Sequence, residues 1–307
     1  MAAKKAQKTR SAGTVGVVGL GIMGGAFAKH LLAAGYKVVG FDPEPARARE
    51  FARRGGTPAG SAAEVAASAS ILITSLPSVK ALKAALLGRD GIAAGAKKGA
   101  VVVEASTFAL ADKEMARRGL AKAGVTMLDC PISGTGAQAA AKDILVYASG
   151  DRKAFNRCRK VFDGFARGTH YCGKFGTGSK LKYLANLLVA IHNLSAAEAL
   201  VLAERAGVNL KLAYEVLKDG AGGSRMFAVR GPMMVRRTYG PATMKIDVWQ
   251  KDMSVIGDFA KSLKCPTPLF SLSEVFYDTA YDLGYGQADT AVVHRLLRDL
   301  ARGKRGR

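Results

Sequence analysis

The sequence has 307 residues, of which 49% are hydrophobic, and it carries a formal net charge of +22. This length is sufficient for one large or two moderate domains with a sizeable core, and an aromatic content of only 7% suits an α/β protein rich in Ala and Gly. No apolar run reaches the length of a membrane span, and residues 1–13 lack the apolar segment of a secretory signal.

The positive charge is spread along the chain, and part of it lies at the two ends. We expect residues 1–12 and 299–307 to be disordered basic tails because they are small and polar. A basic field would attract anionic cofactors and acidic substrates. Nucleic-acid binding is a secondary interpretation, because no known binding module is found and the charges are not interleaved with aromatic residues.

Cysteine and histidine usage indicates the compartment and the absence of a metal. The four cysteines form no C-x-x-C pair and have no regular spacing, which favours a reduced, cytoplasmic protein. The four histidines are scattered, and none is paired with another at ligand spacing. We therefore expect no structural metal.

A strand, a glycine-rich turn and a helix follow one another near the N-terminus. Thr14–Val18 is short and largely β-branched, which is typical of a buried parallel strand, and Ala26–Ala34 predicts a helix. Between them lies the G-x-G-x-x-G pattern Gly19-Leu20-Gly21-Ile22-Met23-Gly24. The first glycine permits a tight turn, the second lets the backbone approach a pyrophosphate, and the third allows close packing of helix on strand. The following helix N-terminus would bind phosphates, so the segment predicts a dinucleotide site.

Strands and helices then alternate up to residue 172, which predicts a parallel, doubly wound (Rossmann) sheet domain over residues 13–172. The expected strands are Lys37–Phe41, Ser70–Leu76, Ala100–Glu104, Thr126–Asp129, Leu145–Ser149 and Thr169–Tyr171, and the expected helices include Pro43–Arg54, Ser61–Ala67, Val79–Leu87 and Leu110–Ala123.

Asp42 follows the second strand, where nucleotide folds place the acid that binds the ribose. Its carboxylate can bind ribose hydroxyls and would repel a 2′-phosphate, which favours NAD as cofactor. NADP stays possible because Arg47 and Arg49 follow nearby.

The pattern changes at Gly173. Residues 179–206 contain no Pro or Gly and predict one long helix that ends at Gly207, and the remainder is expected to be helical. Breaks are predicted at residues 220–223, 231–232 and 265–268. We predict an all-helical substrate and oligomerisation domain over residues 173–298, joined to the sheet domain by the long helix.

Three segments could carry chemistry. Lys182 and Asn186 are four residues apart and share a helix face, where a lysine and an amide could bind a substrate oxygen and move its proton, although most helical lysines are solvated. Ser133, past the end of a strand, could donate a hydroxyl while the next backbone N–H groups hold a carboxylate, but an ordinary turn would look the same. Lys251 and Asp252, read alone, suggest only a solvated ion pair.

Together these segments resemble the β-hydroxyacid dehydrogenase family, which includes 3-hydroxyisobutyrate dehydrogenase and tartronate semialdehyde reductase and is related to 6-phosphogluconate dehydrogenase. The matching segments, in register from about Thr14 to about Leu297, are GLGIMG at Gly19–Gly24, DCPISG at Asp129–Gly134, GTGSKLKYLAN at Gly176–Asn186 and KDM at Lys251–Met253.

The resemblance implies reversible hydride transfer between NAD(P) and the hydroxyl carbon of a small β-hydroxy acid. It implies that Lys182 is the catalytic acid/base and that Asn186 is its companion in the substrate site. As a base, Lys182 must lose its proton, which requires desolvation or a nearby cation. The resemblance also implies that Ser133 and Gly134 bind the substrate carboxylate and that Lys251 closes the site near the nicotinamide. It further implies that the cofactor is lined by Leu76, Pro77 and Thr107.

The sequence also departs from the family pattern. Thr135 stands where the family usually has a second Gly, and it could narrow the carboxylate pocket. GAGGSRMF at Gly220–Phe227 and Gly284–Gly286 with Asp289 resemble the L-threonate dehydrogenase branch, but Arg225 replaces a frequent Trp. Arg225 would favour an acidic or extended substrate, or it faces solvent. Helical domains of this kind commonly form homodimers or homotetramers.

Two alternatives share this architecture. Imine reductases generally lack a Lys at the position of Lys182, and non-catalytic nucleotide-binding readers of the same fold have that Lys replaced. Lys182 therefore disfavours both.

Overall fold

The computed structural model describes residues 12–303. The chain forms two compact units, one up to Lys182 and one from Tyr183, and this division falls inside the long helix. The expected domain boundary after residue 172 stays a prediction. The expected N-terminal tail lies outside the described residues apart from residue 12. At the other end a helix continues to Ala301, so residues 299–301 are helical and not part of a tail.

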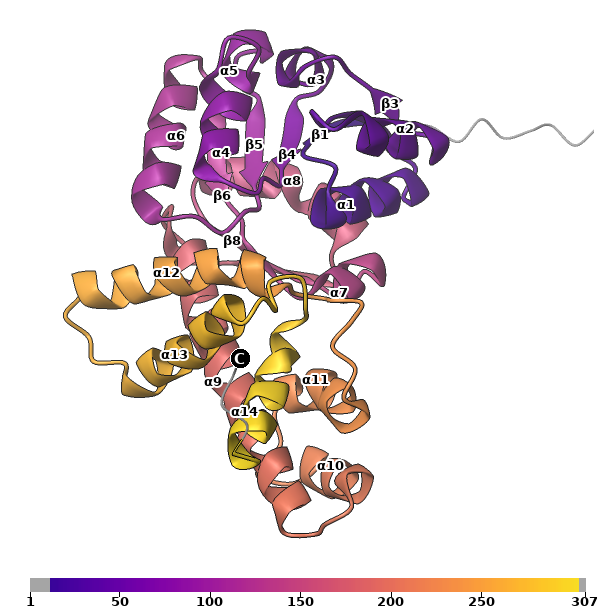
Figure 1. Ribbon diagram of the computed structural model, residues 1–307. Coiled ribbons are helices and arrows are strands. Elements are labelled where there is room, and N and C mark those ends of the chain that lie inside the picture. The colour runs from indigo at the N-terminus through magenta and orange to yellow at the C-terminus, as the bar shows by residue number, and fades with distance from the viewer. Residues whose placement is uncertain (1–11, 304–307) are drawn as a thin grey trace, which may run out of the picture. The chain divides into compact units, whose positions relative to one another are not determined.

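The first unit is built on a six-stranded, all-parallel sheet (Figure 1). Its strands are β1 (Thr14–Val18), β2 (Lys37–Phe41), β3 (Thr57–Pro58), β4 (Ile71–Thr74), β5 (Val101–Glu104) and β6 (Thr126–Asp129). They lie in the order β3-β2-β1-β4-β5-β6, which is the predicted doubly wound topology. Strands β2 and β3 lie on one side of β1, and β4, β5 and β6 lie on the other, so the strand order reverses between β1 and β4. Open α/β sheets bind ligands at the carboxyl ends of the strands at such a point.

Helices cover both faces of this sheet because its strands are apolar on both sides. The helices of the first unit that precede the long helix are α1 (Ile22–Ala33), α2 (Pro45–Arg53), α3 (Ala62–Ser68), α4 (Val79–Leu87), α5 (Ile92–Gly95), α6 (Leu110–Lys122), α7 (Gly136–Ala140) and α8 (Arg152–Phe165). Helices α1 and α8 belong to one hydrophobic cluster, whereas α3, α4 and α6 belong to the other. The Gly-rich stretch 88–99 contains the single turn α5.

The last predicted strands do not extend the main sheet. β7 (Ile132–Ser133), β8 (Leu145–Ala148) and β9 (Gly168–Tyr171) form a separate three-stranded sheet in which β7 and β8 are antiparallel. Pro131 stands between β6 and β7, and it has no N–H to donate to a sheet ladder. An isolated antiparallel bridge between Asp129 and Ser149 joins the two sheets.

The second unit is helical among its described residues. The 29-residue α9 (Thr177–Arg205) is the predicted long helix, and it is followed by α10 (Leu210–Lys218), α11 (Arg225–Arg236), α12 (Ile246–Ser262), α13 (Pro268–Asp282), a 3₁₀ turn at Thr290–Val292 and α14 (Val293–Ala301). The expected break at residues 231–232 is wrong, because α11 runs through it. Pro232 cannot donate to the carbonyl of Ala228, and the Tyr214 hydroxyl donates to that carbonyl instead, at 3.0 Å.

Contrary to the expectation that no apolar run reaches the length of a membrane span, helix α9 is long and apolar enough to cross a membrane by length and composition, with a mean hydropathy of 1.5 in its most apolar window. Core helices pass the same test. Two buried amides on α9, Asn186 and Asn193, bind other helices of the second unit. Asn193 Nδ2 donates to the Tyr277 hydroxyl and to the Thr290 carbonyl, each at 2.9 Å. The helix is therefore held by polar contacts inside the protein.

Candidate active site

The glycine-rich loop follows β1 directly and reaches the loop that follows β4. Gly19 has a φ of +89°, and a Cβ on it would collide with the Ser75 carbonyl oxygen. A Cβ on Gly24 would likewise collide with the carbonyl oxygen of Gly19. At Gly21 a Cβ would meet only the Arg47 guanidinium, at 3.5 Å. The loop is therefore packed against backbone at Gly19 and Gly24 and is accessible at Gly21. A backbone that binds a pyrophosphate requires this arrangement.

Helix α1 begins at Ile22, ahead of the predicted start at Ala26, so Ile22, Met23 and Gly24 form its first turn. The N–H groups of a first helical turn have no partner within the helix and can bind phosphate. Ile22 is 71% exposed, whereas Leu20 is buried in the core. The Ile22 side chain therefore lies at the surface, whereas the Leu20 side chain packs in the core and only its backbone is part of the glycine-rich loop.

Asp42 is buried, and its carboxylate is already engaged at the end of β2. Oδ2 accepts the N–H of Leu20 at 2.8 Å, and Oδ1 accepts the N–H of Glu44 at 2.9 Å. Arg47 Nη1 lies 3.3 Å from Oδ2. Asp42 therefore ties the glycine-rich loop to β2 and has a cation beside it, an ion pair that the sequence did not predict.

The three predicted cofactor-lining residues lie on the loops after β4 and β5. The N–H of Leu76 donates to the Ser106 hydroxyl at 2.9 Å, which joins these two loops. Pro77 is exposed and Thr107 is half-buried. All three positions follow carboxyl ends of strands in the unit that holds the glycine-rich loop.

The predicted carboxylate loop begins at the end of β7. Ser133 is half-buried, and Gly134 has a φ of +142°, where a Cβ would lie 2.7 Å from Ile144 Cγ2. Thr135 acts as the N-cap of α7: its hydroxyl accepts the N–H of Gln138 at 3.4 Å, and its own N–H donates to Gln138 Oε1 at 3.0 Å. This capping box gives Thr135 a role in starting α7.

Helix α7 brings the carboxylate loop beside the glycine-rich loop. A Cβ on Gly136, the first residue of α7, would lie 2.6 Å from Ile22 Cγ2 in the first turn of α1. Further along the two helices, His30 Nε2 of α1 lies 2.9 Å from the Ala139 carbonyl oxygen of α7. The candidate cofactor and substrate segments are therefore neighbours within one unit.

Lys182 and Asn186 lie one turn apart on α9, and both are buried, with exposures of 8% and 4%. Lys180, two residues before Lys182, is exposed. Asn186 Nδ2 donates to Asp252 Oδ2 at 2.8 Å, and Lys251 Nζ lies 3.2 Å from Asp252 Oδ1. The two residues assigned by resemblance, Asn186 and Lys251, are thus joined through Asp252, which the sequence alone indicated only as a solvated partner.

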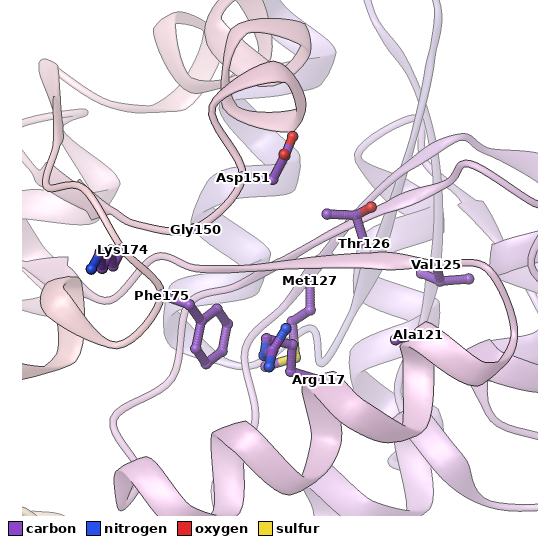
Figure 2. Close-up of a pocket in the computed structure, with 9 residues that line it drawn as sticks. All are labelled: Arg117, Ala121, Val125, Thr126, Met127, Gly150, Asp151, Lys174 and Phe175. Carbon is purple, nitrogen blue, oxygen red and sulfur yellow. The ribbon is translucent and has the colours of Figure 1, made fainter.

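A cavity in the first unit lies away from the predicted site residues. It has a volume of about 360 Å³, and Figure 2 shows its lining at the end of α6, the start of β6 and the segments after β8 and β9. Arg117 stacks over the Phe175 ring there, with 5.4 Å between the guanidinium carbon and the ring centroid. The cavity adjoins the amino end of β6, and it shares no residue with the predicted site. Within residues 12–303, no three His, Cys, Asp or Glu side chains are grouped to hold a metal ion.

Comparisons with known proteins show the family and the fold of this chain. The family described as the NAD binding domain of 6-phosphogluconate dehydrogenase matches residues 14–173, and the family described as NAD-binding of NADP-dependent 3-hydroxyisobutyrate dehydrogenase matches residues 176–297. An L-threonate dehydrogenase of Cupriavidus necator is 33% identical over 92% of this chain and 95% of its own length. The crystal structure of a 3-hydroxyisobutyrate dehydrogenase from Salmonella typhimurium superposes with a TM-score of 0.84 at 34% identity, covering 92% of this chain and 99% of that one.

An imine reductase of Streptomyces aurantiacus is more distant, with a TM-score of 0.62 and 21% identity over 92% of this chain and 99% of its own, and it shares the fold alone. The doubly wound sheet, the glycine cradle and the helical second unit define an NAD(P)-dependent dehydrogenase. The chain belongs to the β-hydroxyacid dehydrogenase family, as the resemblance predicted.

Proposed function

We propose that this dehydrogenase interconverts a small β-hydroxy acid of the L-threonate class and its keto form, with Lys182 as general acid/base. One observation supports the proposal most directly: the predicted carboxylate loop and the glycine-rich loop are neighbours in one unit. Gly136, directly after the carboxylate loop, packs against Ile22 of the glycine-rich loop. The names of the relatives and the segment Gly220–Phe227 support the threonate class. Arg225, in the same segment, is exposed.

Each residue has a defined task in this proposal. A bound nicotinamide supplies the hydride acceptor or donor. Ser133 and the backbone at Gly134 bind the substrate carboxylate and fix the hydroxyl carbon in place. In oxidation the Lys182 amine takes the hydroxyl proton, and in reduction it returns that proton to the carbonyl oxygen. Asn186, held by Asp252, orients the substrate beside Lys182, and Lys251 closes the site near the nicotinamide.

The first test is absorbance of the reduced nicotinamide with a panel of acids: L-threonate, D-glycerate, 3-hydroxyisobutyrate and 6-phosphogluconate. We expect turnover of L-threonate or a close analogue and a loss of about 100-fold or more in Lys182→Ala, because general acid–base catalysis contributes that much. The matched control is Lys180→Ala, which removes an exposed lysine from the same helix. Equal activity of the two variants would rule out the role given to Lys182, and silence with every acid would rule out the substrate class.

We further propose that NAD is preferred over NADP, supported by the buried carboxylate of Asp42 at the end of β2. Asp42→Asn keeps an oxygen for the Leu20 N–H but removes the charge that would repel a 2′-phosphate. We expect the NAD/NADP affinity ratio to fall about tenfold in this variant, and Asp42→Ala to weaken NAD more than NADP. Titration with each reduced cofactor measures both, and an unchanged ratio would contradict the proposal.

We also infer a homodimer or homotetramer formed through the helical unit, in a cytoplasmic setting. Exposed apolar side chains on α9, α10 and α13 support the assembly. Exposed apolar surface of this extent on a helical unit is typical of a protein–protein interface. The basic surface, including Arg152, Lys153 and Arg157 on α8, is read as a solvated face that attracts anionic ligands, and nucleic acid is not among the proposed partners.

A further inference from the structure

Three buried charged side chains lie at the carboxyl ends of β5 and β6, and the proposed chemistry uses none of them. Glu104 ends β5, Asp129 ends β6, and Lys113 comes from α6; all three are fully buried. Lys113 Nζ lies 2.7 Å from Glu104 Oε2 and 2.7 Å from Asp129 Oδ1. Burial opposes protonation of the Lys113 amine, but the two carboxylates raise its pKa above the ordinary value. The cluster therefore holds two carboxylates against one ammonium.

Asp129 also accepts hydrogen bonds from the first turn of α9, and its Oδ2 accepts the Ser149 hydroxyl at 3.1 Å. Its Oδ2 accepts the N–H of Ser179 at 2.8 Å, and its Oδ1 accepts the Ser179 hydroxyl at 2.7 Å. Beside it, the Ser149 hydroxyl accepts the N–H of Gly178 at 2.9 Å. A carboxylate here satisfies N–H groups that have no partner in the helix and complements the positive end of the helix dipole. The excess negative charge of the cluster thus faces the start of α9.

The same turn of α9 lies directly against the backbone of two strands. A Cβ on Gly178 would collide with the Tyr147 carbonyl oxygen and would lie 3.0 Å from that of Asp129. Ser179 is only 1% exposed. Lys182 follows Ser179 by three residues, so the two side chains leave the same side of the helix. Whatever fixes the rotation of α9 at Ser179 therefore fixes the direction in which the Lys182 side chain leaves it.

We propose that Asp129 is a positioning residue for Lys182, because it sets the start and the rotation of α9 and through them the place of the amine. The proposal rests on the proposed function only in taking Lys182 as the acid/base. Displacing a reacting group by about 1 Å can cost on the order of 100-fold in rate. Loss of Asp129 should therefore lower kcat, while cofactor binding at the glycine-rich loop is retained.

The test compares Asp129→Asn with Glu104→Gln. Each substitution removes one carboxylate charge from the same buried cluster and keeps the side-chain shape, but only Asp129 contacts α9. We expect both variants to have a lower thermal midpoint, because both disturb the Lys113 pair. Only Asp129→Asn should lose about 100-fold in kcat, with the KM values for cofactor and acid within about twofold of the wild type.

A second readout needs no substrate. Hydrogen exchange of the amides at residues 178–182, followed by mass spectrometry, should accelerate at least about tenfold in Asp129→Asn and stay near the wild-type rate in Glu104→Gln. If the wild type turns over no acid of the panel, the proposed function fails, and exchange alone decides the role of Asp129. Equal effects of the two variants on kcat and on exchange, or wild-type exchange in Asp129→Asn, would overturn the positioning role.

Discussion

The imidazole of His294 is fully buried in the helical unit, where Nδ1 lies 2.8 Å from the Tyr239 hydroxyl. Burial lowers the pKa of His294 from the ordinary 6.5 to about 4, and Arg298 acts in the same direction while Glu204 opposes it. The ring therefore stays neutral in the fold at a pH where the unfolded chain would protonate it. Stability must then depend on pH.

We predict that lowering the pH from 7 to 5 reduces the free energy of unfolding by about 2 kcal/mol through this residue. Because the folded pKa is depressed, the unfolded chain binds the proton first; the contribution is complete above pH 6.5 and is lost as the pH falls towards 4. Urea unfolding at both pH values measures it, with His294→Gln as the variant that does not titrate. An equal fall in both proteins would assign the loss to other groups.

Individual residues differ in how far the sequence could predict them. Lys182 was found through the family motif, and its burial agrees with a site residue, although its role stays a prediction. Lys113 gave no signal, because a lysine is buried only where carboxylates from other elements pair with it, and those partners come from β5 and β6. Asp289 was noticed only as part of a branch signature, but its buried carboxylate binds Arg230 at 3.1 Å and accepts the backbone N–H of Thr243 at 2.8 Å.

At the scale of elements, long periodic segments were predicted well and short ones were missed. β1, β2, α4 and β6 have the predicted bounds, and α9 is close to them. β3, β7, α5 and α7 span two to five residues, which is too short for a hydrophobic period to show. The course of α11 through Pro232 was not predictable either, because the group that compensates for the missing N–H is the hydroxyl of Tyr214 on another helix.

Among the described elements, helix α13 gives the proposed assembly its clearest support. Leu269, Leu272 and Val275 recur at intervals of three residues and are 63%, 52% and 58% exposed. An apolar stripe of this kind is costly in water and favours burial against another chain. This stripe makes α13 a sharper site for a substitution test than the scattered exposed leucines of α9 and α10.

We predict a solution mass of two or four times 32.1 kDa for the wild type. Leu272→Glu should shift the mass towards that of one chain, because it places a charge in the stripe, whereas Asp278→Ser on the same helix should not. Light scattering coupled to size exclusion distinguishes these outcomes. A wild type with the mass of one chain would contradict the proposed assembly.

At the scale of the whole molecule, the alternation of strands and helices was enough to predict the doubly wound sheet and the helical second half. It could not predict that β8 and β9 leave the main sheet, because β8 pairs with β7 and β9, and β7 has only two residues. The division between the two compact units falls after Lys182, inside a helix that has no Gly or Pro at that point.

The ion cluster at the ends of β5 and β6 also bears on the order of assembly. Lys113 and Asp129 are 16 residues apart, within the single β5–α6–β6 segment, whereas Ser179 is 50 residues from Asp129. Chains are synthesised from the N-terminus, and short loops close at lower entropic cost than long ones. The Lys113–Asp129 pair can therefore form before α9 leaves the ribosome. The Asp129 carboxylate is then already in place when the first turn of α9, the helix that carries Lys182, is synthesised.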